Sequence, residues 1–428
     1  MSTSGDIAII GVGLHPFGRY DGKSALQMGE DAVIEALGDA GVSWDKVDTL
    51  WASSMEVKNP EAITGLLGLT GIPARSTFTG CASGGNTLAQ AANSLRLGDA
   101  NVAVAVGLDK HPRGAFSDHP SVSGLPDWYG DLGLFLTTHF FGMKITRYMH
   151  DFGISHETLA RVASKAFGNG SRNPHAWRNK PLSVEEVLAS PVLNWPLRQY
   201  MYCGPDEGAA AAVLVRAEDA NKYTDTPIYL RASTLFSRRD GAFELLSPSL
   251  PSTGEQSPTV YASKAAYEQA GIGPEDVDVI QLQDTDAGSE VIHMAENGFC
   301  ADGDQEKLIA EGATELGGSM PVNTDGGLLA NGEPVGASGL RQIYEIATRR
   351  SSRASGRRYA DGSPRRPARR ACTTTGRRRA RRTSPPVGSG SASCTTRATP
   401  ACTGPPSTAV ATRVSRTRLP SPKSARRP

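Results

Sequence analysis

Two parts of the chain repeat each other, and this repeat limits the folds that the sequence can adopt. Ala40–Val42 matches Ala270–Ile272, and Val47–Asp48 matches Val277–Asp278, in the same order and with the same separation of 230 positions. Each match follows a stretch with helical spacing of apolar residues and precedes a short apolar run. The chain is therefore expected to contain two similar halves in which helices and strands alternate.

A second, shorter repeat relates Cys81–Gly84 to Gly336–Gly339, and each turn leads toward a helix. Two halves that face each other would bring both glycine-rich turns to one central site. At the start of its helix, Cys81 lies among unpaired backbone N–H groups and near the positive end of the helix dipole, which favour a thiolate. The alternative is that Cys81 is a buried cysteine, which behaves as an inert small hydrophobe.

The alternation of elements predicts an α/β fold with parallel sheets covered on both faces. The expected elements of the two halves are a central strand at Ile7–Ile10, a helix over 24–41, a strand over 47–52, a helix over 262–271 and a strand over 275–282. Residues 111–200 depart from the repeat, with predicted helices over 140–148 and 157–167. We expect this insertion to hold the substrate.

The charge is distributed unevenly along the chain, and this excludes some classes of function. Residues 1–350 carry 26 basic and 43 acidic side chains, a net charge of −17, which argues against nucleic-acid binding by this part. No apolar run reaches the roughly 18 residues of a membrane span, and the first residues lack the pattern of a signal peptide. Cys81, Cys203 and Cys300 are far apart and suggest neither a metal site nor a disulfide framework, so a cytoplasmic location is expected.

The last part of the sequence has a different composition. Residues 351–428 contain 18 Arg and one Lys but a single acid, Asp361, and Leu419 is their one large aliphatic residue beyond valine. Such a segment cannot build a buried strand. Its Arg, Pro, Ser, Thr, Ala and Gly content is typical of GC-rich DNA read in a wrong frame, so we interpret it as a frameshifted tail rather than a natural basic one.

Three motifs resemble the thiolase superfamily: the turn around Cys81, the run Cys203–Ala211, and the run Val322–Gly339. The resemblance covers residues 5–348, and its branch is that of the sterol-carrier-protein-x thiolases and the actinobacterial lipid-transfer proteins. It implies a five-layered αβαβα fold, an acyl-CoA substrate lying across residues 111–200, and a catalytic cysteine at Cys81.

The resemblance also implies the domain organisation and the partners. Residues 5–110 and 201–255 would form the N-terminal half, 111–200 the loop domain, 256–348 a truncated C-terminal half, and 349–428 the tail. The implied assembly is a homodimer, or a heteromer with a small acyl-CoA-binding OB-fold partner. No metal is implied, and no cofactor other than the coenzyme A thioester that serves as substrate.

Two departures from the family pattern bear on the chemistry. Thiolases have Gly-His-Pro where this chain has Gly332-Glu333-Pro334, and the related branch has His-Asp-x-Phe where this chain has Gln283-Asp284-Thr285-Asp286. Both histidines of the family pattern are therefore absent. An ionised glutamate beside Cys81 would raise the pKa of the thiol and disfavour the thiolate.

These residues define the expected site and its chemistry. Retro-aldol cleavage of a β-hydroxyacyl-CoA needs an oxyanion site and a base but no thiolate. We expect Glu333 and Asp284 as bases or orienting groups, with Gln283 beside them and Cys81 shaping the pocket. The candidate oxyanion groups are Asn331, Gly332, Gly336, Ser338 and Gly339. The alternatives are thiolytic acyl transfer through Cys81 and a non-catalytic lipid or acyl-CoA carrier.

The tail yields a first test. Because residues after about 350 carry many arginines and almost no large apolar side chains, we expect limited trypsin digestion of the native protein to remove them rapidly. Mass spectrometry of the surviving core measures where cleavage stops. Protection of those arginines would contradict the frameshift interpretation.

Overall fold

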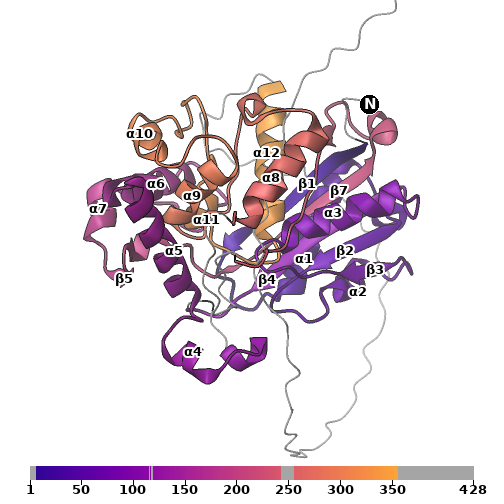
Figure 1. Ribbon diagram of the computed structural model, residues 1–428. Helices are drawn as coiled ribbons and strands as arrows, with labels where there is room; N and C mark the ends of the chain where they lie inside the picture. Colours follow the sequence, from indigo (N-terminus) through magenta and orange to yellow (C-terminus); the bar gives the residue numbers. More distant parts are fainter. Residues whose placement is uncertain (1–5, 115, 117–118, 242–254, 355–428) are drawn as a thin grey trace, which may run out of the picture.

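The computed structural model describes residues 6–114, 116, 119–241 and 255–354. Its strands are β1 (Ile7–Gly18), β2 (Thr49–Ser53), β3 (Ala74–Ser76), β4 (Val102–Lys110), β5 (Val192–Asn194), β6 (Leu197–Arg198), β7 (Glu207–Arg216) and β8 (Ile228–Leu230). Its α-helices are α1 (Ala25–Ala40), α2 (Thr64–Leu67), α3 (Ser83–Arg96), α4 (Asp127–Asp131), α5 (Thr137–Phe152), α6 (His156–Gly170), α7 (Val184–Ala189), α8 (Pro258–Ala270), α9 (Ala287–Glu296), α10 (Gln305–Ala310), α11 (Gly327–Asn331) and α12 (Ser338–Ala354). In Figure 1 the sheet lies to one side of α8 and α12, and α5, α6 and α7 lie to the other.

One six-stranded sheet, in the order β3-β2-β4-β7-β1-β8, carries the N-terminal half. The prediction of a parallel sheet is confirmed for β2, which pairs parallel with β3 and β4, and is wrong for β7, which pairs antiparallel with both β4 and β1. The reason lies in the insertion between β4 and β7. The C-terminal end of β4 and the N-terminal end of β7 lie side by side, where the His111 N–H donates to the Asp206 carbonyl at 3.1 Å. A strand that begins beside the end of its neighbour runs in the opposite direction, so the two strands pair antiparallel.

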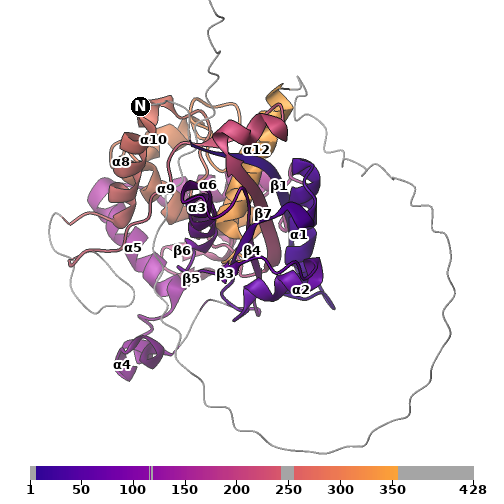
Figure 2. The same cartoon turned by 90° about the vertical axis from the view of Figure 1, so that its right-hand side faces the viewer.

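Helix α1 covers one face of the sheet, as the sequence predicts. Ser24 and Gln27 form a capping box at its start, and Gly41 ends it in the left-handed conformation with φ of 65°. Its buried side packs on the strands so closely that a Cβ on Gly11 would lie 2.4 Å from the Ala36 carbonyl oxygen. Figure 2 shows α1 on one face of the sheet and α3 and α12 on the other.

The two predicted glycine-rich turns meet at the starts of α3 and α12. A Cβ on Gly84 would lie 2.8 Å from the Leu340 nitrogen, and one on Gly339 would lie 2.7 Å from the Gly85 nitrogen. Only glycine allows two backbones to approach this closely. The first turns of both helices are therefore packed against each other next to Cys81, as the repeat predicts.

In the part of the chain that the structure describes, the second half repeats the helix of the first half but not its sheet. Helix α8 ends at Gly271 with φ of 65°, as α1 ends at Gly41. The strand predicted over 275–282 is wrong: within the described residues it is reduced to one parallel bridge between Ile280 and Val322. A strand needs hydrogen-bonding neighbours on its edges, and the described part of the second half supplies only this one. The fold remains of the thiolase-like α/β class.

Residues 111–200 contribute α4 to α7 and the two-stranded β5-β6 sheet. The predicted helices at 140–148 and 157–167 are confirmed as α5 and α6. They pack on α9 and α11 of the second half through a shared apolar cluster that includes Ile145, Leu159, Val291 and Leu329. Helix α12 continues to Ala354, into the predicted tail, and the rest of the tail lies outside the described residues. Among the helices that are described, none is long and apolar enough to cross a membrane.

The contact between the two glycine-rich turns predicts unequal effects of equal substitutions. We expect Gly84→Ala to lower the free energy of unfolding by about 1–3 kcal/mol, because the added methyl group meets backbone atoms that cannot move aside. Gly38→Ala is the matched control, since nothing lies within 4 Å of its Cβ position in α1, and it should stabilise by about 0.5–1 kcal/mol. Urea unfolding measures both, and equal effects would contradict this packing.

Candidate active site

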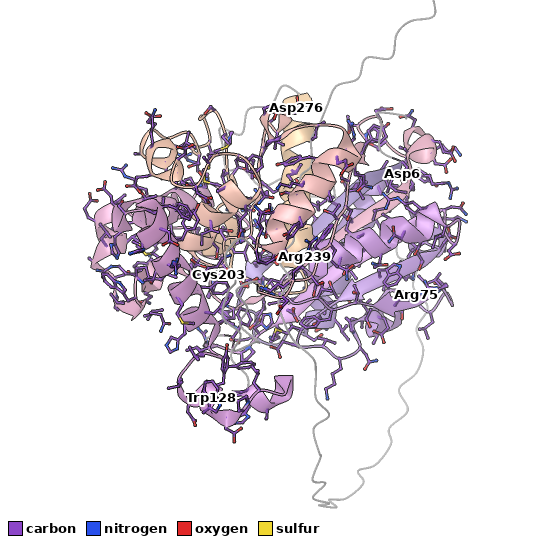
Figure 3. The ribbon with its side chains drawn as sticks, in the orientation of Figure 1. Asp6, Arg75, Trp128, Cys203, Arg239 and Asp276 are labelled. Carbon is purple, nitrogen blue, oxygen red and sulfur yellow. The ribbon has the colours of Figure 1, made fainter. Side chains whose placement is uncertain are left out.

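Glu333 lies at the centre of the candidate site. It follows α11 in a turn whose position is fixed by the hydrogen bond from the Glu333 N–H to the Gly204 carbonyl, at 3.0 Å. The side chain is 1 % exposed. Its Oε1 accepts from Gln283 Nε2 at 2.7 Å, and its Oε2 accepts from Cys203 Sγ at 3.3 Å. The structure thus brings Gln283 and Glu333 together, as the sequence predicts, and adds Cys203, which lies where the sheet meets the helices of residues 111–200 (Figure 3).

Cys81 is held as a thiol. Burial of its sulfur raises the pKa of Cys81 well above its usual value, and the charge of Glu333 and a hydrogen bond to it raise the pKa further. Burial and Glu333 act on Cys203 in the same direction. These effects outweigh the thiolate preference that the start of α3 gives to Cys81. In the described part of the chain, the largest influences on the two thiols include no imidazole, the side chain that would activate a cysteine for attack.

Glu333 itself is poised to accept a proton. Burial raises the pKa of Glu333, while hydrogen bonds from Cys81, Cys203 and Gln283 and the nearby His111 oppose the rise. A carboxylate with a raised pKa binds a proton more strongly at neutral pH than an exposed one. At the centre of the site, the buried Glu333 carboxyl group, which can act as a base, therefore lies beside two thiols that resist ionisation.

Asp206 is a second buried carboxyl group in the site, and the sequence analysis did not single it out. It packs under Gly332, where a Cβ would lie 2.1 Å from Asp206 Oδ2, so glycine is required there, with φ of 93°. Neither oxygen of the Asp206 carboxyl group has a hydrogen-bond partner among the described residues. Burial raises the pKa of Asp206 well above its usual value, against the opposing charges of Arg19 and Arg178. The sequence signal for Asp206 was its position directly before Glu207, the first residue of the apolar strand β7.

Asp284 orients the turn rather than facing Glu333. Its carboxyl oxygens accept from the Leu328 N–H at 2.7 Å and the Leu329 N–H at 3.3 Å, so it caps the start of α11. Burial and the charge of Glu290 raise the pKa of Asp284 to about 8. Of the two roles expected for Asp284, the geometry supports the orienting one.

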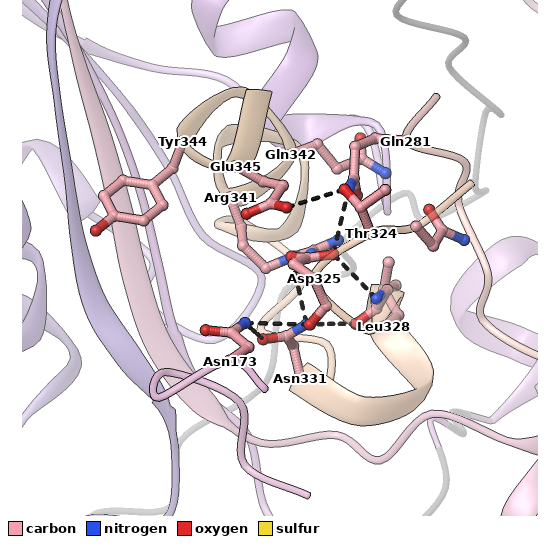
Figure 4. Close-up of polar contacts among 12 residues, drawn as sticks. Asn173, Gln281, Thr324, Asp325, Leu328, Asn331, Arg341, Gln342, Tyr344 and Glu345 are labelled. Carbon is pink, nitrogen blue, oxygen red and sulfur yellow. Dashed lines mark hydrogen bonds and ion pairs between the residues drawn. The ribbon is translucent and has the colours of Figure 1, made fainter. Parts of the chain in front are cut away.

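Asn331 also supports the turn, in the network that Figure 4 shows. Its Nδ2 donates to the Gly327 carbonyl at 2.7 Å and to the Asp325 carbonyl at 3.2 Å, and its Oδ1 accepts from Asn173 at 3.2 Å. The Asp325 carboxylate forms a buried ion pair with Arg341 of α12. These contacts use the amide of Asn331 within the protein and join α11 to α12.

The remaining candidate oxyanion groups differ in their freedom to bind a ligand. The Gly336 N–H donates to Asp109 Oδ2 at 2.6 Å, and its carbonyl accepts from Ser53 Oγ at 2.9 Å. By contrast, the Ser338 hydroxyl is buried and has no hydrogen-bond partner among the described residues. Ser338 and Gly339 open α12 beside the start of α3. Among the described residues the Ser338 hydroxyl is therefore still free to donate to a ligand oxygen, whereas the Gly336 N–H is already engaged.

Asp109 near the end of β4 and His111 just after β4 contact the turn that follows Glu333, and both were missed as site residues. Asp109 is fully buried and accepts from Ser54 Oγ at 2.5 Å as well as from Gly336. His111 Nε2 accepts from the Val335 N–H at 3.1 Å. Their place just after an apolar strand was a usable signal, since functional side chains gather at the carboxyl ends of strands in α/β sheets.

The arrangement predicts how the thiols react. Glu333→Gln removes the negative charge beside Cys81, so the pKa of this thiol falls and alkylation by iodoacetamide at pH 8 accelerates, by about tenfold for each pKa unit. Peptide mapping measures each cysteine separately. Cys300 is the internal control, because burial and the charges of Asp304 and Asp302 raise its pKa to about 12, without Glu333.

Glu311→Gln is the matched control variant. Glu311 directly follows α10, its side chain is exposed, and it pairs with Lys307 of α10. It should leave the alkylation rate of Cys81 unchanged. A Cys81 rate that is the same in Glu333→Gln and in the unsubstituted protein would refute the electrostatic account of the site.

Comparisons with known proteins agree with this fold. The family models "Thiolase, N-terminal domain" and "Thiolase C-terminal domain-like" match residues 7–181 and 249–364. An acetyl-CoA acetyltransferase of Methanothermobacter thermautotrophicus is 30% identical over 375 residues, which cover 84% of this chain and 94% of that protein. Human sterol carrier protein 2 is 28% identical over 357 residues, covering 79% of this chain and 65% of that protein.

Solved structures give the same assignment. The Ltp2-ChsH2(DUF35) aldolase is similar with a TM-score of 0.72 and 27% identity, over 81% of this chain and 90% of that one. Human mitochondrial 3-ketoacyl-CoA thiolase, at 16% identity and a TM-score of 0.59, shares the fold over 83% of this chain and 93% of its own. The chain therefore belongs to the thiolase superfamily, in the branch of the sterol-carrier-protein-x thiolases and lipid-transfer proteins, and is an enzyme of the thiolase-like acyltransferase or aldolase type.

Proposed function

We propose that the protein catalyses retro-aldol cleavage of a β-hydroxyacyl-CoA. The observation that carries the proposal is the position of Glu333, a buried carboxyl group that accepts from Cys203 Sγ and Gln283 Nε2 and whose charge keeps Cys81 protonated. A site with a base and without a thiolate suits chemistry that forms no acyl-enzyme. The similarity to the Ltp2-ChsH2(DUF35) aldolase supports the same choice.

In the proposed reaction Glu333 removes the proton of the substrate's β-hydroxyl group. The Cα–Cβ bond then breaks, the oxygen on Cβ becomes a carbonyl, and the bonding electrons move into the thioester to form an enolate. Protonation of the enolate at Cα, by the acid that Glu333 has become, gives the shortened acyl-CoA. The buried Ser338 hydroxyl and the junction of α3 and α12 are the groups proposed to stabilise the enolate oxygen.

Thiolytic acyl transfer through Cys81 is the second candidate. The similarity to an acetyl-CoA acetyltransferase favours it, and Cys81 lies just before α3, which begins at Ser83 and whose N-terminal N–H groups favour a thiolate. The Glu333 charge opposes it, because attack on a thioester requires the thiolate. A non-catalytic acyl-CoA carrier is the third candidate, and the similarity to sterol carrier protein 2 is its support.

The proposal extends to substrate, location and assembly. The substrate is a coenzyme A thioester with a steroid or branched lipid side chain, held across residues 111–200, and no other cofactor takes part. A cytoplasmic location is proposed because its reducing conditions keep Cys81, Cys203 and Cys300 as the free cysteines that the structure describes.

The proposed assembly is a homodimer, or a heteromer with a small acyl-CoA-binding OB-fold partner. Two features support an interface at the edge of the sheet: β3 is an edge strand, and Leu66 and Leu69, just before it, are 44% and 87% exposed. The complex named in the aldolase structure is consistent with a partner.

The order of two substitutions tests the proposal. In a frame-corrected protein given a β-hydroxyacyl-CoA without free CoA, we expect Glu333→Gln to lower the turnover rate by about 10² to 10⁴, the usual contribution of a general base. Cys81→Ser should cost far less. Release of the shortened acyl-CoA is measured by chromatography, and Glu311→Gln serves as the surface control.

The opposite order, together with an absolute need for free CoA, would favour the thiolytic candidate. Binding of acyl-CoA without product from the frame-corrected protein would favour the carrier. For the chain with the present residues 351–428 we expect little or no turnover. The family resemblance implies a final loop that carries a second catalytic cysteine, or a tyrosine in the aldolase-like members, between strands, and the composition of residues 351–428 lacks the apolar side chains of such strands.

A further inference from the structure

His111 links the end of β4 to the turn that carries Glu333. The side chain is buried, and its ring packs edge-on against Phe116 with 5.0 Å between centroids. Nδ1 lies 2.8 Å from Glu56 Oε1, and Nε2 accepts from the Val335 N–H at 3.1 Å. The ring therefore connects the loop after β2 to the Glu333 turn.

Two neighbours compete for Nε2. The Val335 N–H is a donor, so it requires that Nε2 carry a lone pair, which fixes the neutral tautomer with the proton on Nδ1 facing Glu56. Asp109 Oδ2 lies 3.5 Å from the same nitrogen and is an acceptor, so it requires a proton on Nε2. A single imidazole cannot satisfy both partners at once, and its protonation state decides which contact is made.

We propose that His111 is a positioning residue that couples the Glu333 turn to proton uptake. When neutral, its Nε2 holds the Val335 N–H and fixes the turn. When protonated, it turns its Nε2–H toward Asp109, releases the Val335 N–H and places a positive charge near Glu333. The role of His111 rests on the proposed function in one respect: Glu333, whose position His111 fixes, is the proposed base.

The charges around His111 place this exchange in an accessible pH range. Burial opposes a charge on the ring, but the carboxylates of Asp109 and Glu56 outweigh burial and raise the pKa of His111 to about 9. The other groups that face it are Glu333 across the turn, Arg19, which donates to the His111 carbonyl, and Asp206, whose carbonyl accepts from the His111 N–H. The ring is protonated below about pH 9 and neutral above it. The exchange of Asp109 for Val335 as partner of Nε2 therefore falls in a pH range that a titration can cover.

Nuclear magnetic resonance of protein labelled with ¹⁵N at histidine and valine tests the proposal without turnover. Between about pH 6 and 10, we expect His111 Nε2 to change from protonated to bare with a midpoint near 9. The Val335 amide, assigned with Val335→Ile, should shift with the same midpoint as it gains its acceptor. In His111→Gln, whose side-chain oxygen reaches the same position without titrating, the Val335 amide should show no step in this range.

His150→Gln is the matched control, since the His150 side chain is 85% exposed and lies far along α5, and it should leave the Val335 step intact. Three results would overturn the proposal: a His111 Nε2 in one state throughout, a Val335 amide that does not follow it, or a step that persists in His111→Gln. If His111→Gln does not fold, the titration of the unsubstituted protein still decides. Because no readout depends on product, the proposal and the retro-aldol function can fail separately.

Discussion

The buried carboxylate of Asp109 is the contact on which the candidate site depends. It accepts hydrogen bonds from Ser54 Oγ, from the Met55 and Glu56 N–H groups and from the Gly336 N–H, at 2.5 to 3.1 Å. These donors come from the loop after β2 and from the turn before α12, segments almost three hundred residues apart in the chain. Although burial opposes the charge of Asp109, His111 in its protonated form and the hydrogen bonds from Ser54 and the backbone lower the pKa of Asp109, so it stays ionised. Each hydrogen bond to a charged group contributes about 1.5–3 kcal/mol, so this one side chain can hold both loops at the end of β4.

Asp109 holds the turn that contains Glu333 through the Gly336 N–H. The charge of Glu333 in turn favours one chemistry over the other. Two unit charges about 4 Å apart repel each other by about 4 kcal/mol at an effective dielectric constant of about 20, which corresponds to about three pKa units. A carboxylate beside Cys81 and Cys203 therefore suppresses both thiolates. The same burial that makes a thiolate costly makes the carboxylate a stronger base. We propose that Glu333, at the histidine position of the Gly-His-Pro pattern, makes a buried carboxylate rather than a cysteine thiolate the reactive group of this site.

Local patterns predicted the parts of the fold that are held by local interactions. The helix over 24–41, the helices at 140–148 and 157–167, and the meeting of the two glycine-rich turns follow from periodicity, capping and the repeat, and the pairing of Gln283 with Glu333 follows from the family pattern. The antiparallel entry of β7 was missed, because direction depends on where the 111–200 insertion returns to the sheet. Cys203, Asp206 and His111 were missed as site residues because their roles depend on contacts across the chain, and a lone buried polar residue looks the same in sequence whether or not it faces a site.

The central claim is that Cys81 is a pocket thiol and Glu333 the reactive group. Intact-mass spectrometry of the protein after brief incubation with an acyl-CoA tests it most directly, because a thiolase nucleophile keeps the acyl group as a thioester when no acceptor is present, whether or not later steps occur. The account predicts an unmodified protein mass, and it predicts that Glu333→Gln, with its more acidic Cys81, gains an acyl group more readily than the unsubstituted protein. A stoichiometric acyl adduct on Cys81 of the unsubstituted protein, mapped by peptide analysis, would contradict the account.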